Sequence, residues 1–169
     1  MKIVVVGTRG IPDIQGGVET HCEELYPRLA AMGHDVTVVR RSCYVTPQNK
    51  IKEYRGVHLK DIYAPRRKSI EAIVHTFLAI IYARWVGADV LHIHAIGPAL
   101  LTPLARLLGL RVVMTHHGPD YDRQKWNKTA KSVLRWGERM GANYANEVIV
   151  ISTVIDNILR EKYDRTDAH

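Results

Sequence analysis

The chain begins with a short apolar segment, and residues 2–18 read KIVVVGTRGIPDIQGGV. The run Lys2–Val6 is rich in β-branched residues and is closed by Gly7, which is typical of a buried parallel strand. The glycine-rich loop after it leads into a helix expected over Val18–Met32, with Gly33 at its C-terminal end. A strand, a glycine-rich loop and a helix in this order predict the first unit of an alternating α/β fold.

The same alternation continues along the rest of the chain. Further strands are expected at residues 36–39, 54–59, 62–64, 90–94, 111–115 and 147–151. Further helices are expected at Ser69–Val86 with Ser69 as the cap, at Pro98–Leu108, at Lys128–Tyr144 and from Ser152 or Thr153 to Lys162. This order predicts an α/β domain over residues 1–163, with a doubly wound, mainly parallel, Rossmann-like sheet, followed by a polar tail at 164–169. In such a sheet, ligands bind beyond the carboxyl ends of the strands.

The composition fits one globular domain, because 46% of the 169 residues are hydrophobic and 24% are charged. The formal charge of +7 is concentrated between Arg40 and Lys68, a segment that contains nine basic residues and two acidic ones. A single basic segment suggests a local docking surface rather than a general affinity for nucleic acid. Arg66, Arg67 and Lys68 precede the apolar helix and are the predicted contacts with an anionic membrane. The alternative is a solvated loop without a partner.

Cysteine content and hydropathy bear on the compartment. Two cysteines, Cys22 and Cys43, do not make a disulfide framework in a chain of this length. No apolar run reaches the about 18 residues of a spanning helix, and no secretory signal is expected. We expect a cytoplasmic protein, with peripheral attachment to the inner membrane face kept as an option.

The loop after the first strand contains Gly7, Gly10, Gly16 and Gly17. Its spacing matches neither G-x-G-x-x-G nor G-x-x-x-x-G-K-[ST], so the two common phosphate-binding motifs are excluded. Gly16 and Gly17 still stand at a predicted helix N-terminus, where free N–H groups and the helix dipole favour an anion such as a diphosphate. The alternative is a long turn that only needs glycines.

Four histidines follow two of the predicted strands: His92, His94, His116 and His117. Together they could hold a metal ion, but no cysteine or acid stands at a ligand spacing to them, and we expect no metal site. His92 is interpreted as a core residue with a satisfied hydrogen bond. His94 and His117, at strand ends, are the better candidates for contact with substrate. The loop Asp120–Trp126 mixes acids, bases and aromatic residues, which often marks function.

Taken together, these residues resemble the N-terminal half of a GT-B glycosyltransferase of family 4, the retaining nucleotide-sugar group. The resemblance rests on Lys2–Pro12, Gly16-Gly17-Val18-Glu19-Thr20, Met32–Val38, Asp89–His94 and Thr115-His116-His117-Gly118. The stretches Thr8–Pro12 and Asp122–Trp126 resemble the rhamnosyltransferase-like subgroup, in which the position of His117 is often acidic.

The resemblance implies a reaction and a set of residues. The donor would be a nucleoside-diphosphate sugar, the anomeric configuration would be retained, and positive charge rather than a metal or cofactor would stabilise the departing diphosphate. His117 would be the catalytic residue near the transferring sugar. The loop near the diphosphate and the acceptor would contain Arg9, Gly16, Gly17 and Thr20. The other substrate-binding residues would be His94, His116, Gly118 and Asp120.

The resemblance also implies a second domain. The donor half of the family supplies an Arg/Lys pair and a Glu-x7-Glu element, and neither follows Ser152. We therefore expect an N-terminal acceptor domain, separated or truncated, whose tail at 164–169 lies near the interdomain linker. Its acceptor would be a saccharide, lipid-linked at the membrane, in the assembly of cell-surface polysaccharide. Donor binding would need the C-terminal domain, and the chain alone would transfer no sugar.

Two other interpretations stay open at this point. The chain could be a non-enzymatic α/β binding module that holds a partner through its basic segment, although no RNA-binding or helix-turn-helix signature is present and no nucleic acid is expected. It could also be a small metal-dependent hydrolase that uses the clustered histidines.

Overall fold

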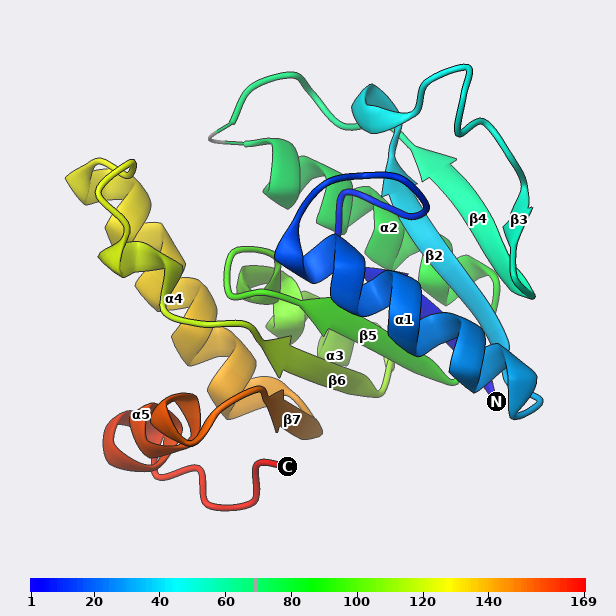
Figure 1. Cartoon of the computed structure of the whole chain (residues 1–169). Coiled ribbons are helices and arrows are strands. Elements are labelled where there is room, and N and C mark those ends of the chain that lie inside the picture. The colour runs from blue at the N-terminus through cyan, green and yellow to red at the C-terminus, as the bar shows by residue number, and fades with distance from the viewer. Residues whose placement is uncertain (69) are drawn as a thin grey trace.

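One sheet organises the computed structural model, which describes residues 1–68 and 70–169 (Figure 1). Its seven strands within those residues are β1 (Lys2–Val6), β2 (Asp35–Arg41), β3 (Glu53–Tyr54), β4 (Val57–Ile62), β5 (Val90–His94), β6 (Val112–His116) and β7 (Glu147–Val150). They lie in the order β3-β4-β2-β1-β5-β6-β7, and all pairs are parallel except β3 with β4. The predicted doubly wound, mainly parallel sheet is confirmed.

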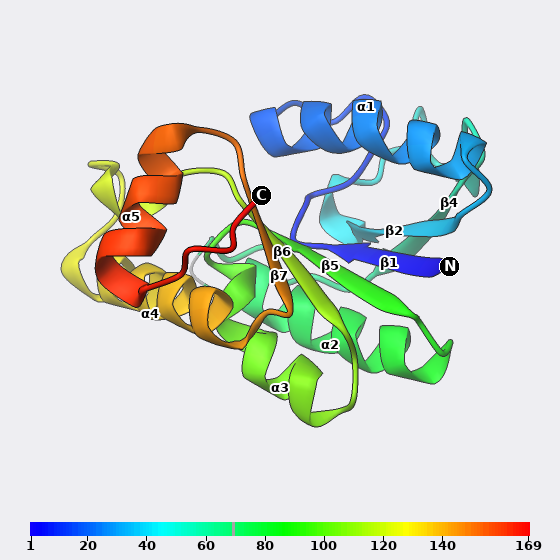
Figure 2. The same cartoon turned by 90° about the horizontal axis from the view of Figure 1, so that it is seen from below.

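Helices cover both faces of this sheet. They are α1 (Gly17–Ala31), α2 (Glu71–Trp85), α3 (Thr102–Leu107), α4 (Lys128–Tyr144) and α5 (Thr153–Tyr163), with 3₁₀ turns η1 (Ser42–Tyr44), η2 (Pro98–Leu101) and η3 (Asp120–Asp122). Figure 2 shows α1 on one face and α2, α3 and α4 on the other. Asn127 and Ser152 cap α4 and α5 by accepting hydrogen bonds from first-turn N–H groups. The predicted cap Ser69 lies outside the described residues, and α2 begins at Glu71.

The sequence-based assignment was wrong in the third strand region. The single strand predicted over 54–59 is a hairpin in which Tyr54 pairs with Val57. Arg55 and Gly56 both have positive φ, 47° and 83°, which is the geometry of a two-residue turn between antiparallel strands. No separate strand forms over 62–64, because Ile62 is the last residue of β4 and residues 63–64 lie outside any strand. The helix predicted over 98–108 is η2 followed by α3.

Strand alternation divides the core into two clusters. Ile3 and Val5 of β1 face α1, where they belong to a cluster with Cys22 and Tyr26. Val4 and Val6 face the other side and belong to the cluster with α2, α3 and α4. Successive strand side chains point to opposite faces, so the apolar run of β1 is buried on both.

The last six residues pack against the domain. The guanidinium of Arg165 donates to the carbonyl oxygens of Ala142, Ala145 and Asn146 at 2.9–3.0 Å, where α4 ends. The backbone of His169 pairs with Val148 and Val150 of β7 at 3.0 and 2.8 Å. The polar tail therefore lies against the C-terminal end of α4 and along β7, the edge strand of the sheet. In the part of the chain that is described, no helix has the length and hydrophobicity to cross a bilayer.

Gly137 lets α4 lie directly against η2. A Cβ at this position would collide with the backbone carbonyl of Ile96, which a side-chain rotation cannot relieve. At Gly141, one turn later, a Cβ would lie 3.0 Å from the Cβ of Ala99 and 3.0 Å from the sulfur of Met114. Two glycines four residues apart thus bring α4 onto the sheet at a short distance.

Replacement of Gly137 by alanine is expected to destabilise the fold. The new methyl group must push α4 away from η2, at a cost of about 1–3 kcal/mol in the free energy of unfolding. Urea denaturation followed by circular dichroism measures this loss. Gly97→Ala is the matched control, because Gly97 has helical φ and its nearest neighbour, a Leu134 methyl, is 3.5 Å from the new Cβ. Equal stability of the two variants would contradict the packing argument.

Candidate functional site

The sheet changes direction of winding between β1 and β5. The chain moves outward from β1 through β2 to β4, and then crosses back to β5 and continues outward to β7. Ligands of doubly wound sheets bind at such a switch point, beyond the carboxyl ends of the strands. Here β1 ends beside Gly7, whose backbone lies so close to that of His94 that no side chain fits between them. The β1–α1 loop and the end of β5 therefore form one edge.

The carboxylate of Glu19 folds the loop between β1 and α1. Its Oε1 accepts hydrogen bonds from the Thr8 hydroxyl at 3.1 Å and from the Arg9 amide at 2.8 Å. The Thr8 oxygen in turn accepts from the Gly10 amide at 3.1 Å. Glu19 is buried, so this small network holds the loop against the first turn of α1.

The predicted diphosphate loop is brought together at the N-terminus of α1. Gly16 is the N-cap and no side chain among the described residues caps this end, which leaves first-turn amides open to a ligand. Arg9 is exposed beside it, and its Nη1 donates to the Gln15 carbonyl at 3.2 Å. Thr20 instead turns its hydroxyl back to the Gly16 carbonyl at 3.0 Å.

A row of buried polar side chains runs from β6 through β5 to the edge of the sheet. Thr115 Oγ1 is 2.7 Å from His92 Nε2, and His92 Nδ1 is 2.8 Å from the Tyr26 hydroxyl. The same hydroxyl is hydrogen-bonded to His94 Nε2, and His94 Nδ1 is 2.8 Å from His117 Nε2. His92 is thus a buried residue with both nitrogens satisfied, as predicted. His94 is fully buried and reaches the edge through His117.

These imidazoles are held in the neutral form. Burial, with a contribution from neighbouring histidines, lowers the pKa of His92 to about 3. The same causes lower the pKa of His94 well below its ordinary value, and burial lowers the pKa of His117 to about 4. His117 is half-buried, whereas His92 and His94 are buried, so His117 is the histidine of this row that remains accessible.

His21 and Tyr26 were not among the predicted site residues. His21, on α1, stands edge-on to the rings of His94 and His117, with centroid distances of 5.7 and 5.2 Å. Burial lowers its pKa as well. Tyr26 lies on the buried side of α1 with Cys22. The available signal for Tyr26 was its position four residues after Cys22, which places both on the same side of α1.

His116 points away from this row. Its Nδ1 accepts a hydrogen bond from the Gly118 amide at 3.0 Å, and its Nε2 donates to Glu138 Oε1 at 2.8 Å. His116 is fully buried, and this pairing fixes the neutral Nε2–H tautomer. The geometry does not support the predicted contact between His116 and substrate. Gly118 supports His116, while Asp120 pairs at the surface with Arg123 at 3.0 Å.

Glu138 ties four elements together. Its carboxylate receives hydrogen bonds from His116, from the Tyr121 hydroxyl and, at 2.7 Å, from the Tyr163 hydroxyl. The ammonium of Lys162 lies 3.9 Å away. Burial by itself would raise the pKa of Glu138, but the hydrogen bonds from His116 and Tyr163 and the nearby positive charge outweigh it and lower the pKa. Glu138 therefore stays ionised inside the protein and fixes η3 and α5 to α4.

The basic segment is less uniform than its composition suggested. Arg40 is fully buried and forms a two-pronged pair with Asp61, at 2.7 and 3.1 Å. Arg41 is buried too and lies 2.7 Å from Glu71, at the start of α2. These two guanidiniums hold loops together and take no part in docking. The exposed basic residues of the segment are Lys50, Lys52, Arg55, Lys60, Arg66, Arg67 and Lys68.

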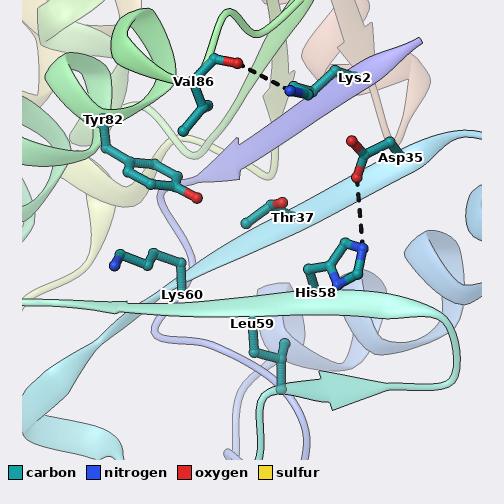
Figure 3. A pocket seen from close by; sticks show the side chains of 8 residues that line it. All are labelled: Lys2, Asp35, Thr37, His58, Leu59, Lys60, Tyr82 and Val86. Carbon is teal, nitrogen blue, oxygen red and sulfur yellow. Dashed lines mark hydrogen bonds and ion pairs between the residues drawn. The ribbon is translucent and has the colours of Figure 1, made fainter.

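A hollow of about 310 Å³ lies at the opposite edge of the sheet, near the amino ends of β1 and β2 (Figure 3). Lys2, Asp35, His58 and Lys60 surround it. The Lys2 ammonium already donates to the Val86 carbonyl at 3.0 Å, and His58 lies 3.8 Å from Asp35. Its charges are mixed and partly engaged, and it lies at the wrong edge of the sheet for a ligand of this fold.

No three His, Cys, Asp or Glu side chains are placed to share a metal ion within residues 1–68 and 70–169. His116 bonds to Glu138 on one side of β6, while His92 and His94 bond to Tyr26 on the other. The four clustered histidines therefore do not converge on one point, and the arrangement does not support the metal-dependent hydrolase.

The fold is that of a Rossmann-like half of the GT-B class. Residues 15–169 match the model of Glycosyltransferase Family 4, and the chain belongs to this family. Family membership favours an enzyme over the binding-module alternative. Among curated proteins, no sequence matches this chain significantly.

Solved structures share the fold at low sequence identity. Sucrose-phosphate synthase from Thermosynechococcus elongatus is 20% identical with a TM-score of 0.74, over 95% of this chain and 45% of the synthase. A fragment of the same synthase is 18% identical with a TM-score of 0.64, over 99% of this chain and 84% of the fragment. UDP-N-acetylglucosamine 2-epimerase is 14% identical with a TM-score of 0.57, over 96% of this chain and 44% of the epimerase. The chain spans less than half the length of the full synthase and of the epimerase.

Loss of the Glu138 charge is expected to weaken the fold in a pH-dependent way. Glu138→Gln should lower the free energy of unfolding by about 2 kcal/mol at neutral pH, since hydrogen bonds to a charged group are lost. The lowered pKa means that the ionised carboxylate stabilises the fold above its unfolded pKa and stops doing so as the pH falls through the folded value. The gap between wild type and variant should therefore shrink in acid. Urea denaturation across that pH range measures it.

The matched control is Glu161→Gln, because Glu161 is an exposed glutamate on α5. Its stability should follow wild type at every pH. A gap for Glu138→Gln that stays constant from neutral to acid pH would contradict the assignment of an ionised buried carboxylate.

Proposed function

We propose that this domain serves a retaining glycosyltransferase that moves a sugar from a nucleoside-diphosphate donor to a saccharide acceptor. The observation that carries the proposal is the edge at the β1/β5 switch point, where the uncapped N-terminus of α1 and Arg9 lie on the same side as His117. Membership of Glycosyltransferase Family 4 supports the reaction class.

The edge offers two kinds of group to such a reaction. The backbone amides of Gly16 and Gly17, together with the Arg9 guanidinium, suit the negative charge that develops on a departing diphosphate. His117 is neutral and half-buried, so it suits a hydroxyl group of the sugar or acceptor rather than a charged group. We assign donor-half contacts to a second α/β domain, in line with the 45% share of the synthase that this chain covers.

We further propose a lipid-linked acceptor and a membrane-facing side. On α2 the side chains of Phe77, Ile81 and Trp85 are 45%, 46% and 81% exposed at a spacing of four residues, so they form one apolar stripe. Arg66, Arg67 and Lys68 are exposed immediately before this helix. An apolar stripe on a helix that follows a basic segment suits the surface of an anionic bilayer. A lipid-linked saccharide would put the reaction in the assembly of cell-surface polysaccharide.

Inorganic diphosphate, the group shared by all such donors, is expected to bind at the N-terminus of α1. In an NMR titration, the amide resonances of Gly16, Gly17 and Val18 should shift together. Arg9→Ala should weaken the apparent affinity about tenfold, which corresponds to one charge-assisted contact. Lys52→Ala, which removes an exposed charge outside the edge, should leave it unchanged. Shifts centred on another surface would overturn the assignment.

Binding to vesicles is expected to depend on both parts of the membrane-facing side. The wild type should co-sediment with phosphatidylglycerol vesicles and much less with phosphatidylcholine vesicles. Arg66→Glu with Arg67→Glu should abolish this preference, and Trp85→Ala should reduce binding to anionic vesicles. Lys50→Glu with Lys52→Glu has the same change in charge and should retain the binding. Equal sedimentation with neutral and anionic vesicles would refute the docking proposal.

A further inference from the structure

One hydroxyl group links the buried histidines of β5 to the edge of the sheet. Tyr26 is fully buried, and its oxygen is hydrogen-bonded to both His92 and His94. His94 continues to His117 at the edge, and His92 continues inward to Thr115. Four hydrogen bonds thus join five side chains in series, and they are called the Tyr26 chain below.

The number of hydrogens in the Tyr26 chain is fixed. Burial lowers the pKa of His92 to about 3 and that of His117 to about 4, and raises the pKa of Tyr26, so each of these groups is neutral at neutral pH. A neutral imidazole has one N–H and one acceptor nitrogen, and a phenol has one O–H. No carboxylate among the described residues is hydrogen-bonded to a member of the Tyr26 chain.

Tyr26 can donate to only one of its two histidine partners, so the other one must donate to Tyr26. When Tyr26 donates to His94 Nε2, His94 carries its hydrogen on Nδ1 and donates it to His117 Nε2. His117 then has its own hydrogen on Nδ1. His92, which donates to Tyr26 through Nδ1, is in the same tautomer.

The second arrangement reverses every bond. Tyr26 donates to His92 Nδ1, and His94 donates to Tyr26 through Nε2. His94 Nδ1 is then an acceptor, so His117 donates to it through Nε2 and keeps a lone pair on Nδ1. The two arrangements contain the same hydrogens and carry no charge. Any mixture of tautomers leaves a bond with two hydrogens, a bond with none, or the Tyr26 hydrogen without an acceptor, each of which is costly among buried groups.

We propose that Tyr26 is a positioning residue that, acting through His94, sets whether Nδ1 of His117 is a donor or an acceptor toward a ligand hydroxyl at the edge. Within the described residues, Nδ1 of His117 has no hydrogen-bond partner and is the nitrogen left for a ligand. That the ligand is a sugar rests on the proposed function, whereas the coupling of the tautomers does not. A ligand that selects one state of His117 therefore selects the tautomers of two buried histidines as well.

The test reads the tautomers directly in the full chain. Long-range ¹H–¹⁵N correlation spectra of ¹⁵N-histidine-labelled protein distinguish Nδ1–H, Nε2–H and imidazolium forms at neutral pH. His92, His94 and His117 are expected to share one tautomer, or one averaged ratio if both arrangements exchange. His116 is the internal reference, because Gly118 and Glu138 hold it as Nε2–H. Different tautomers among the three, or an imidazolium, would overturn the inference.

The variant Tyr26→Phe removes the link without removing a histidine. His94 and His117 should then stay matched to each other while the tautomer ratio of His92 departs from theirs. Tyr54→Phe is the matched control, because the Tyr54 hydroxyl donates to Glu23 at 3.1 Å and is not part of the Tyr26 chain. This variant should leave the tautomers of all three histidines unchanged. Identical tautomers in Tyr26→Phe and wild type would contradict the role of Tyr26. If the variant does not fold, the wild-type spectrum alone decides.

The outcome is separable from that of the proposed function. Matched tautomers without diphosphate binding at α1 would keep the Tyr26 chain and remove the glycosyltransferase site. Diphosphate binding with unmatched tautomers would keep the proposed glycosyltransferase site and remove the coupling through Tyr26.

Discussion

The hydrogen bonds of the Tyr26 hydroxyl to His92 and His94 are the contacts on which the carboxyl edge depends. They place a polar group of α1 against β5 in the middle of an otherwise apolar layer. A buried imidazole nitrogen left without a partner costs about 1–3 kcal/mol, so both histidines need this oxygen. Because every member stays neutral, the edge avoids the larger cost of burying a charge. His117 is positioned by this neutral chain.

Ionic groups do a different task, which is to fix the loops around that edge. Glu19 holds the β1–α1 loop, Arg40 with Asp61 holds the segment after η1, and Glu138 holds η3 and α5. Each is a buried charge with several partners, the only condition under which such a charge is tolerated. The charged groups therefore stabilise the surrounding loops, while His94 and His117 remain uncharged.

The sequence predicted the parts of the fold that have local signals. The β-branched run of β1, the caps at Ser152 and the strand-end position of His117 can be read from neighbours in the chain. Partners far apart in sequence could not be read in this way. Arg40 looked like surface charge because Asp61 lies 21 residues away, and Tyr26 was not singled out because its partner His92 lies 66 residues away. The hairpin turn at Arg55-Gly56 was missed because β-branched and aromatic residues flank it on both sides.

The family match begins at residue 15 and leaves β1 outside, yet the site cannot be divided there. β1 lies between β2 and β5, so it is the central strand on which the matched strands are built. Gly7 packs against the backbone of His94, and Glu19, inside the matched region, holds Thr8 and Arg9, which lie outside it. An anion at α1 and a sugar at His117 would therefore share one rigid edge. Residues 1–14 belong to the same structural unit as the matched part, because β2 and β5 are joined into one sheet only through β1.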